Sequence, residues 1–382
     1  MNNLAVDEAA TNYRTPGQLI SALLDANGWT KRTASAMLGM SESTLNKVAG
    51  DKQPVTAEIA VLLEDVFRVS AEEFLALQQA FDLSRARYAS PPNPARAARG
   101  KLLSELPINE MVDRHWIKVE NAKDVGSLDK ALGRFFGQSN IELIADLPHA
   151  AKKTDQSAPP TMTQLAWLYR VKTIAAQLLV PKRFSHECEK QLLAKLKPLL
   201  AAPEEARKVP RILTEFGIRF LVVECLKGTK IDGVCLWLDG ESPVIAMTAR
   251  YDRMDNFWFV LRHELEHVFR GHGKTSPVVD SEIESGDQLD EDEIVANFAA
   301  SEFCAPSARI DSFIARKAPL FPERDFLGLA NILGVHPCLV AGQIRFKTKR
   351  FDLFSRHMVK VRSAVLPSAI VDGWGDIAPV EI

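Results

Sequence analysis

The sequence predicts an α+β protein with more than one domain. Apolar residues recur at helical spacing through most of the 382 residues. Three strand-like segments, IRFLVVE, GVCLWL and PVIAMT, lie between 218 and 248 and are separated by the turn sequences KGTKID and DGES. Helical spacing resumes near 255, so we expect a small sheet beside helices in the C-terminal half. Because single hydrophobic cores usually stop growing before this length, the chain should form several compact parts.

We expect four segments along the chain. Residues 1–84 read as an all-helical module, and residues 85–101 as a basic, proline-rich linker. In the linker, three prolines disfavour a continuous helix, and five positive charges follow one another without an acid: Arg85, Arg87, Arg96, Arg99 and Lys101. Residues 102–200 are mostly helical, and their function is not legible. Residues 201–382 hold the strands and the helices that follow them.

Composition excludes several classes of protein. No apolar run reaches the roughly 18 residues that cross a bilayer, so we expect no membrane association. The first residues, MNNLAVDEAATNY, lack the features of a secretory leader, and a cytoplasmic location follows as an expectation. Five scattered cysteines without a CxxC pair predict reduced core thiols. A formal charge of −2 gives no general attraction to nucleic acid, so any basic surface must be local.

The segment NFWFVLRHELEHVFRGHG contains the motif HExxH on a predicted helix. His263 and His267 stand four residues apart, so both imidazoles project to one side and can bind one metal ion. Glu264 lies about 100° round the helix, which suits a general base that takes a proton from water activated by zinc. Asp255 or Asn256 is the predicted helix cap, and Gly271 fits just past the helix end.

A third ligand is expected in DEDEIVANFAASEFCAP. Glu293 opens a predicted helix, and Asn297 lies four residues later on the same face. The Asn297 oxygen can accept a hydrogen bond from the outward nitrogen of a ligating histidine and fix its tautomer. His263, His267 and Glu293 would therefore hold Zn²⁺, with one coordination position left open for catalysis.

Other interpretations of these residues stay open. The HExxH segment can be a surface helix with satisfied histidines, and Glu293 a solvated first-turn acid favoured by the helix dipole. His272 is a rim group, a substrate contact or a structural residue, because its distance from His267 does not match the longer HExxHxxGxxH motif. His336, before Pro337, reads as a turn residue.

The segments around this motif resemble the ImmA/IrrE family of zinc metallopeptidases over about residues 205–306. WFVLRHELEHVFRGH and EIVANFAASEFCAP carry the resemblance, and ILGVHPCLVAGQIRF is similar to the family's C-terminal portion. The resemblance implies a zincin-like domain over 201–382, zinc ligands at His263, His267 and Glu293, and a catalytic Glu264. One departure is Glu266, where many relatives have glycine; there, a long acid would crowd the cleft or line it with negative charge.

The N-terminal module contains two short helices around a turn at Gly39-Met40, with Ser41 as the predicted N-cap of the second helix. In a helix-turn-helix the second helix enters the DNA major groove, while Leu45 and Val48 would face the core. The predicted DNA-facing residues are Lys31, Ser41, Glu42, Ser43, Thr44, Asn46 and Lys47. A helical protein-interaction module without DNA is the alternative.

Residues 15–84 resemble the Cro/C1-type (XRE) helix-turn-helix family and its HigA-type antitoxin branch, through GWTKRTASAMLGMSESTLNKVAGDKQPVTAEIAVLLEDVFRVSAEEFLALQQAFDL. This resemblance implies binding to a double-stranded DNA operator. The sequence departs from the family at Lys31, where relatives usually have glutamine, and at Ala34, where they have leucine. Lys31 can still reach a phosphate, so the departures concern sequence-specific contacts.

Together these features predict a DNA-binding regulator fused to a zinc-dependent endopeptidase. The resemblance implies a protein substrate, such as a repressor or a toxin, and leaves a homodimer open. A rival hypothesis is a HigA-like antitoxin or repressor whose peptidase-like domain senses a signal or binds a partner with little catalysis. A small-molecule hydrolase is a third class, because the same metal chemistry attacks esters and amides.

Overall fold

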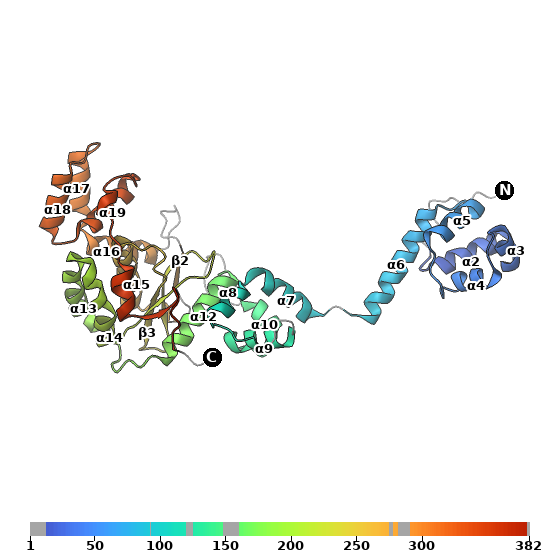
Figure 1. Ribbon diagram of the computed structural model, residues 1–382, viewed down its shortest axis with the longest axis horizontal. Helices are drawn as coiled ribbons and strands as arrows, with labels where there is room; N and C mark the ends of the chain where they lie inside the picture. Colours follow the sequence, from blue (N-terminus) through green and yellow to red (C-terminus); the bar gives the residue numbers. More distant parts are fainter. Residues whose placement is uncertain are drawn as a thin grey trace. The chain divides into compact units, whose positions relative to one another are not determined.

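A computed structural model describes residues 13–91, 93–119, 125–147, 160–274, 278–281 and 291–379. The chain divides into two compact units, Met1–Asn93 and Pro94–Ile382. Each unit has its own helices, which Figure 1 labels along the chain. The fold is mixed α+β, as predicted, with an all-helical first unit and a sheet in the second.

The first unit is a bundle of short helices, each beginning at a hydroxyl residue. Its helices are α2 (Pro16–Asn27), α3 (Lys31–Met37), α4 (Glu42–Ala49), α5 (Ala57–Phe67) and α6 (Ala71–Ala89). In every case the preceding Ser or Thr side chain accepts a hydrogen bond from a backbone N–H in the first turn. Buried apolar residues at helical spacing, including Leu19, Ile20, Leu45, Leu63 and Phe74, form one core.

The segment between the helices is much shorter than the predicted linker, residues 85–101. Helix α6 continues to Ala89 and α7 (Pro94–Glu105) begins at Pro94, so only residues 90–93 lie between helices. Pro94 starts α7, because proline is tolerated in a first helical turn. Two positive charges of the predicted linker have partners within the second unit. The Arg99 side chain pairs with Asp129 at 2.6 Å, and Lys101 Nζ donates to the Ala145 carbonyl at 2.8 Å.

The second unit is a five-stranded sheet with helices on both faces. Its strand order is β4-β2-β3-β1-β5. The three predicted strands are present as β1 (Arg219–Val223), β2 (Ile231–Trp237) and β3 (Pro243–Met247). Two further strands, β4 (Val278–Ser281) and β5 (Ile370–Asp372), were not predicted. Strand β1 runs parallel to β3 and β5, and β2 runs antiparallel to β3 and β4.

The boundary predicted at residue 201 does not divide two compact units. Buried residues of the middle helices, such as Leu102, Met111 and Trp167, share a core with Leu221 and Val234 of the sheet. These helices are α7, α8 (Ile108–Asp113), α9 (Val125–Phe136), α10 (Ile141–Ala145) and α12 (Met162–Gln177). Helical spacing could not show this, because it marks an apolar face without identifying what covers it.

Helices from later in the chain form a second core on the other face of the sheet. They are α13 (Glu189–Leu196), α14 (Val209–Glu215), α15 (Met254–Arg270), α16 (Glu291–Cys304), α17 (Ser307–Lys317), α18 (Glu323–Leu333), α19 (Pro337–Thr348) and α20 (Arg362–Val365). Short 3₁₀ turns connect some of them: η3 (His186–Cys188), η4 (Lys197–Ala201), η5 (Pro203–Lys208), η6 (Ser355–His357) and η7 (Leu366–Ser368).

A buried ion pair joins the middle helices to the last strand. Arg170 on α12 pairs with Asp372 on β5, with Nε 2.9 Å from Oδ2. The same carboxylate accepts a hydrogen bond from Trp116 Nε1 at 2.7 Å and one from the Ala378 backbone N–H at 3.0 Å. Arg170 and Asp372 are both almost fully buried, so these hydrogen bonds offset the cost of removing two charges from water.

All five cysteines are free thiols, and Cys235, Cys304 and Cys338 are buried. Within the described residues, no single helix is long and apolar enough to cross a membrane. Only α18 and α19 taken together meet that requirement, and they are bent by 116° relative to each other.

Candidate metal centre and helix-turn-helix

Helix α15 carries the HExxH motif and packs against β2 and β3. Val260, Leu261, Leu265 and Val268 are buried at helical spacing, which fixes the helix on the sheet. The predicted caps Asp255 and Asn256 are wrong, since the N-cap of α15 is Arg253, two residues before Asp255, and Arg253 makes no side-chain cap hydrogen bond. Asp255 instead accepts a hydrogen bond from Arg253 Nε at 3.0 Å. Gly271 ends the helix with φ 74°, as predicted.

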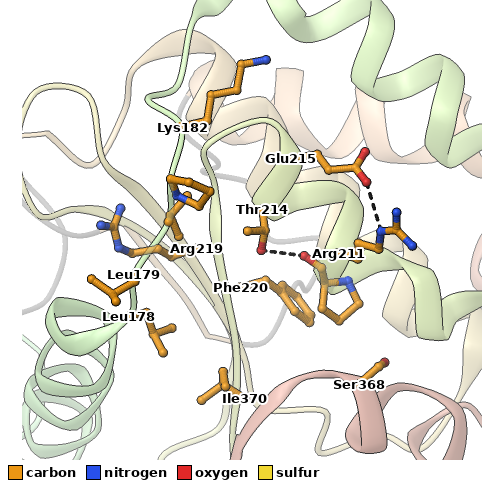
Figure 2. Close-up of a pocket in the computed structure, with 13 residues that line it drawn as sticks. Leu178, Leu179, Lys182, Arg211, Thr214, Glu215, Arg219, Phe220, Ser368 and Ile370 are labelled. Atoms are coloured by element: carbon orange, nitrogen blue, oxygen red, sulfur yellow. Dashed lines mark hydrogen bonds and ion pairs between the residues drawn. The ribbon is translucent and has the colours of Figure 1, made fainter.

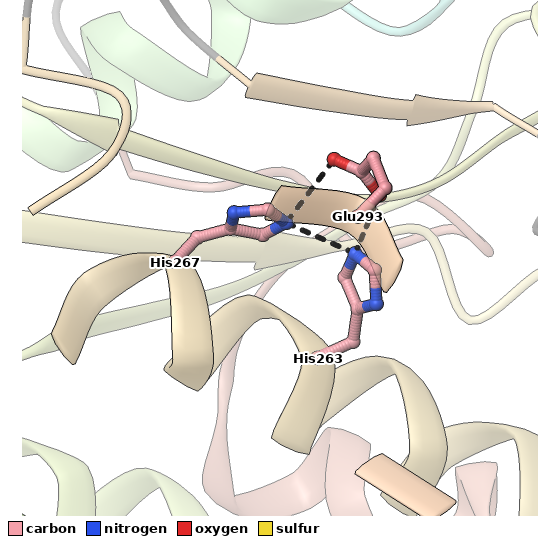
Figure 3. A group of neighbouring side chains, drawn as sticks. All are labelled: His263, His267 and Glu293. Atoms are coloured by element: carbon pink, nitrogen blue, oxygen red, sulfur yellow. Dashed lines mark hydrogen bonds and ion pairs between the residues drawn. The ribbon is translucent and has the colours of Figure 1, made fainter. Parts of the chain in front are cut away.

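The structure brings the three predicted ligands together. His263 Nε2 and His267 Nε2 lie 3.0 Å apart on one side of α15, and both side chains are buried. Glu293, from the first turn of α16, places one carboxylate oxygen 3.2 Å from His263 Nε2 and the other 3.3 Å from His267 Nε2. Figure 3 shows the three side chains converging from two helices. Glu293 is therefore not the freely solvated acid of the alternative interpretation.

The spacing of these atoms fits a tetrahedral metal ion. Two donors bound to one zinc ion at about 2.0–2.1 Å lie roughly 3.3 Å apart. The two imidazole nitrogens are 3.0 Å apart, and each lies 3.2 or 3.3 Å from a different carboxylate oxygen of Glu293. Two imidazole nitrogens and one carboxylate form a common donor set for catalytic zinc. The residues present therefore fit the group that the sequence predicts.

The charge of Glu293 suits this role. Burial by itself raises the pKa of Glu293, but hydrogen bonds from His263 and His267 outweigh it and lower the pKa to about 2. A carboxylate that stays ionised at neutral pH is ready to bind a cation.

The outward nitrogens of both histidines have partners. His263 Nδ1 lies 3.1 Å from Asn297 Oδ1, which is the contact predicted for Asn297. His267 Nδ1 lies 2.9 Å from His272 Nδ1, and His272 Nε2 lies 3.4 Å from an Asp292 carboxylate oxygen. With Nε2 of His267 facing the site, its Nδ1–H donates to His272. The two contacts would hold the imidazoles in one tautomer and orientation.

Sequence reasoning missed the role of His272, although a signal was present. His272 lies between Gly271 and Gly273, which both have positive φ, 74° and 81°. A Cβ on Gly273 would lie 2.6 Å from the Cys235 carbonyl oxygen, so only glycine lets this turn approach β2. Trp237 Nε1 donates to the His272 carbonyl at 2.7 Å and fixes the turn. The sequence GHG after the helix thus directs the imidazole back towards His267.

Glu264 is fully buried between α15 and the sheet. Gly233 on β2 lies against it, because a Cβ at this position would lie 2.2 Å from Glu264 Oε1 and 2.9 Å from Val260 Cγ1. Glycine is therefore required at 233 to leave space for the carboxylate. In the sequence this glycine is the first residue of the predicted strand GVCLWL, and a glycine in a strand indicates close approach of another group.

The expectation that Glu266 lines the cleft with negative charge is wrong. Its carboxylate accepts hydrogen bonds from Arg262 and Arg270, each at 2.8 Å, and it is buried. Burial raises the pKa of Glu266, but these two guanidinium groups outweigh that effect and lower it overall. Glu266 is neutralised by its neighbours on α15 and does not line the site with negative charge. His336, the predicted turn residue, caps α19 by accepting a hydrogen bond from the Cys338 N–H at 3.1 Å.

The helix-turn-helix consists of α3, a turn at Gly39-Met40 and α4. Ser41 caps α4, as predicted, and its hydroxyl also lies 2.8 Å from Thr44 Oγ1. Leu45 and Val48 are buried, also as predicted. The remaining predicted DNA-facing side chains are exposed: Lys31, Glu42, Ser43, Asn46 and Lys47. Ser41 and Thr44 use their hydroxyls within the cap, so they are less available than those five.

Comparison with known proteins identifies the N-terminal unit. Residues 20–74 match the helix-turn-helix family model, so the chain contains a helix-turn-helix domain of the type expected from the sequence, which supports a DNA-binding regulator. No curated protein matches the chain.

Three solved structures are similar to a small part of the chain. One, from Nostoc punctiforme, is described as an antidote protein of a plasmid maintenance system, with 28% identity over 20% of this chain and 87% of that one, and a TM-score of 0.20. Antitoxin GraA shares 27% identity over 19% of this chain and 81% of its own, with a TM-score of 0.19. A HigA-family addiction module antidote protein from Coxiella burnetii shares 20% identity over 24% of this chain and 91% of its own, with a TM-score of 0.18.

Proposed function

We propose that this chain is a DNA-binding regulator whose second unit is a zinc-dependent peptidase. The observation that carries the proposal is the convergence of His263 Nε2, His267 Nε2 and the Glu293 carboxylate within 4.8 Å of one another, with Glu264 buried on the same helix. The resemblance to ImmA/IrrE peptidases favours a protein substrate, with a repressor or a toxin as the specific candidates.

Each residue has a distinct task in this proposal. His263, His267 and Glu293 hold the metal, which supplies Lewis-acid activation of water and of a peptide carbonyl when it is bound. Glu264 accepts a proton from the attacking water and returns it to the leaving amine. Asn297 and His272 orient the two imidazoles through their outward nitrogens.

Metal binding is tested first. Elemental analysis of the purified chain should show about one zinc per chain, and most of it should be lost when His263 and His267 are both replaced by alanine. Equal zinc in both proteins would remove the proposed site.

Catalysis is tested with Glu264→Gln, because glutamine keeps the size of the side chain but cannot accept the proton. The variant should retain zinc and lose cleavage by about 10²–10⁴. The protein encoded by the adjacent gene is the first candidate substrate, and Glu58→Gln, at an exposed position of the first unit, is the matched control. Full cleavage by a zinc-loaded Glu264→Gln protein would show that Glu264 is not the base. If neither protein cleaves a partner, yet both release DNA in response to a ligand, the sensing hypothesis replaces the peptidase.

DNA binding is tested on α4. Ser43 and Asn46 have exposed side chains that make no hydrogen bond within the described part of the chain, so alanine at both positions leaves the fold intact. Binding to the operator should weaken more than binding to random duplex, and both should fall steeply with salt. Ser84→Ala, on exposed α6, is the control. Equal losses on both duplexes would argue against base recognition by α4.

A further inference from the structure

A cavity of about 570 Å³ lies in the second unit, among residues outside the metal centre. Figure 2 shows its lining, which comes from the chain after α12, from α14 and from the β1 and β5 end of the sheet. Its volume falls within the range of small-molecule sites, about 300–1,000 Å³. The residues that line it include Leu178, Leu179, Lys182, Arg211, Glu215, Arg219 and Ile370.

The cavity exists because β5 is shorter than its neighbour. Strand β1 pairs with β3 from Arg219 onwards, whereas its pairing with β5 begins only at Leu221, opposite Ile370. Arg219 and Phe220 therefore have a strand on one side only. Helix α12 ends at Gln177, and the chain that follows it lines the cavity with Leu178 and Leu179, opposite α14.

The lining carries an excess of positive charge. Lys182, Arg211 and Arg219 line the cavity against a single carboxylate, Glu215. Glu215 is already bound by Lys195 Nζ at 2.9 Å and by Arg211 Nε at 3.1 Å. The Lys195 hydrogen bond is the main reason why the pKa of Glu215 is lowered. Its negative charge is thus shared by two cations, and the cavity as a whole attracts anions.

Arg219 is the group that most needs a partner. Its Nε atom is buried, and among the described residues it has no hydrogen-bond acceptor. Buried donors in proteins are almost always satisfied by protein, water or ligand. In Figure 2 Arg219 lies on the same side of the cavity as Leu178 and Leu179, opposite Arg211 and Glu215. A planar guanidinium beside apolar walls suits a carboxylate or phosphate attached to a hydrocarbon body.

The apolar part of the lining supports the same class of ligand. Ile370 and Leu178 offer hydrocarbon surface on the side of Arg219, and Leu179 at the rim is 98% exposed. Covering a leucine that is fully exposed to water is favourable, and an anion without a hydrocarbon part could not do so.

We propose that this cavity binds a small organic anion with a carboxylate or phosphate head and an apolar body. The site is separate from the metal centre. Arg219 pairs with Val244 at the start of β3, whereas Gly233, below Glu264, pairs with Met247 at its end. The two sites lie at opposite ends of one strand, so occupancy of the cavity does not require metal.

The test uses the full-length protein and ligand-observed NMR titration with octanoate as the probe. Octanol, which lacks the charge, and inorganic phosphate, which lacks the hydrocarbon, are the matched ligands. We expect octanoate to bind at least about tenfold more tightly than either, because the charge-assisted hydrogen bond and the apolar contact each contribute. Octyl phosphate in place of octanoate distinguishes the two head groups.

Two variants locate the binding. Arg219→Gln should weaken octanoate binding about tenfold, and Ser368→Trp, at an exposed lining position, should abolish it by filling the cavity. Arg324→Gln, at an exposed position on α18, should bind as the wild type does. Melting temperatures near that of the wild type show that the variants are folded. The proposal is overturned if octanoate does not bind, if octanol binds equally well, or if both cavity variants retain wild-type affinity.

Discussion

Replacing His272 with alanine should weaken metal binding although His272 is not itself a ligand. The imidazole lies 2.9 Å from the outward Nδ1 of His267 and connects it to Asp292. Its removal leaves the Nδ1–H of His267 without the acceptor that fixes the ring. His267 can then rotate, and its Nε2 spends less time directed at His263 Nε2 and Glu293.

The magnitude follows from the burial of the lost contact. Removing a hydrogen-bond partner of a ligating histidine typically costs about 10–100-fold in metal affinity. The His272 side chain is 22% exposed, so water can enter the space it leaves and satisfy part of the lost contact. We therefore expect a loss near the lower limit, about tenfold, or about 1.4 kcal/mol. Asn297→Ala should have a similar effect through His263, where the contact is 3.1 Å.

The assay is a competition between the protein and a chromogenic zinc chelator, which needs no knowledge of the substrate. His115→Asn is the matched control, because His115 is exposed, and its φ of 57° is one that asparagine adopts readily. The control should bind zinc as the wild type does. Unchanged zinc affinity in His272→Ala, with the fold intact, would refute the proposed role of His272.

Three further predictions follow from the packing of the second unit. Gly233→Ala should retain zinc but reduce cleavage by about 10²–10⁴, because the new Cβ would displace the Glu264 carboxylate. Gly240→Ala, which has open space around it, is the control. The assay measures cleavage and zinc content on the same samples. Asp372→Ala should lower the free energy of unfolding by about 3–5 kcal/mol in urea titrations, because it leaves Arg170 buried without its partner, whereas exposed Asp376→Ala should change it little. Burial raises the pKa of Cys304 from 9.0 to about 12, so iodoacetamide at pH 8 should modify half-buried Cys225 well before Cys304, as measured by mass spectrometry. Because the unfolded state loses the Cys304 proton first, this thiol's contribution to stability is complete below pH 9 and should be lost as the pH rises towards 12.

Local patterns in the sequence predicted most of the secondary structure near the site. The three strands β1–β3, the cap at Ser41 and the glycine at the end of α15 are all confirmed. These features depend on residues within a few positions of one another, so the sequence contains the whole interaction. The predicted caps of α15 are wrong because local preference was not enough. Asp255 is a suitable cap residue, but it binds Arg253 and contacts Cys338, which lies 83 residues away.

The helical period alone placed His263 beside His267, since residues four apart share a face of a helix. Helical spacing could not predict that Glu293 lies beside the two histidines, because the distance between α15 and α16 depends on how the two helices pack. It also could not show that His272 turns back to His267, which requires β2 to hold the turn through Trp237. Short strands such as β5, with three residues, carry too little pattern to be recognised and are defined only by the strand they pair with.

The sequence by itself determined which side chains are available for metal binding, proton transfer and DNA contact, since these depend on residue type and helical spacing. Tertiary structure decided that the middle helices and the sheet form one unit, that Glu266 is neutralised, and that a cationic cavity opens beside β1. The physical reason is that burial and pairing of charges depend on contacts between segments far apart in the chain. No local pattern identifies the partner, so Arg219, an ordinary residue at the start of a predicted strand, becomes a candidate ligand contact only when the shortness of β5 leaves it at an open corner.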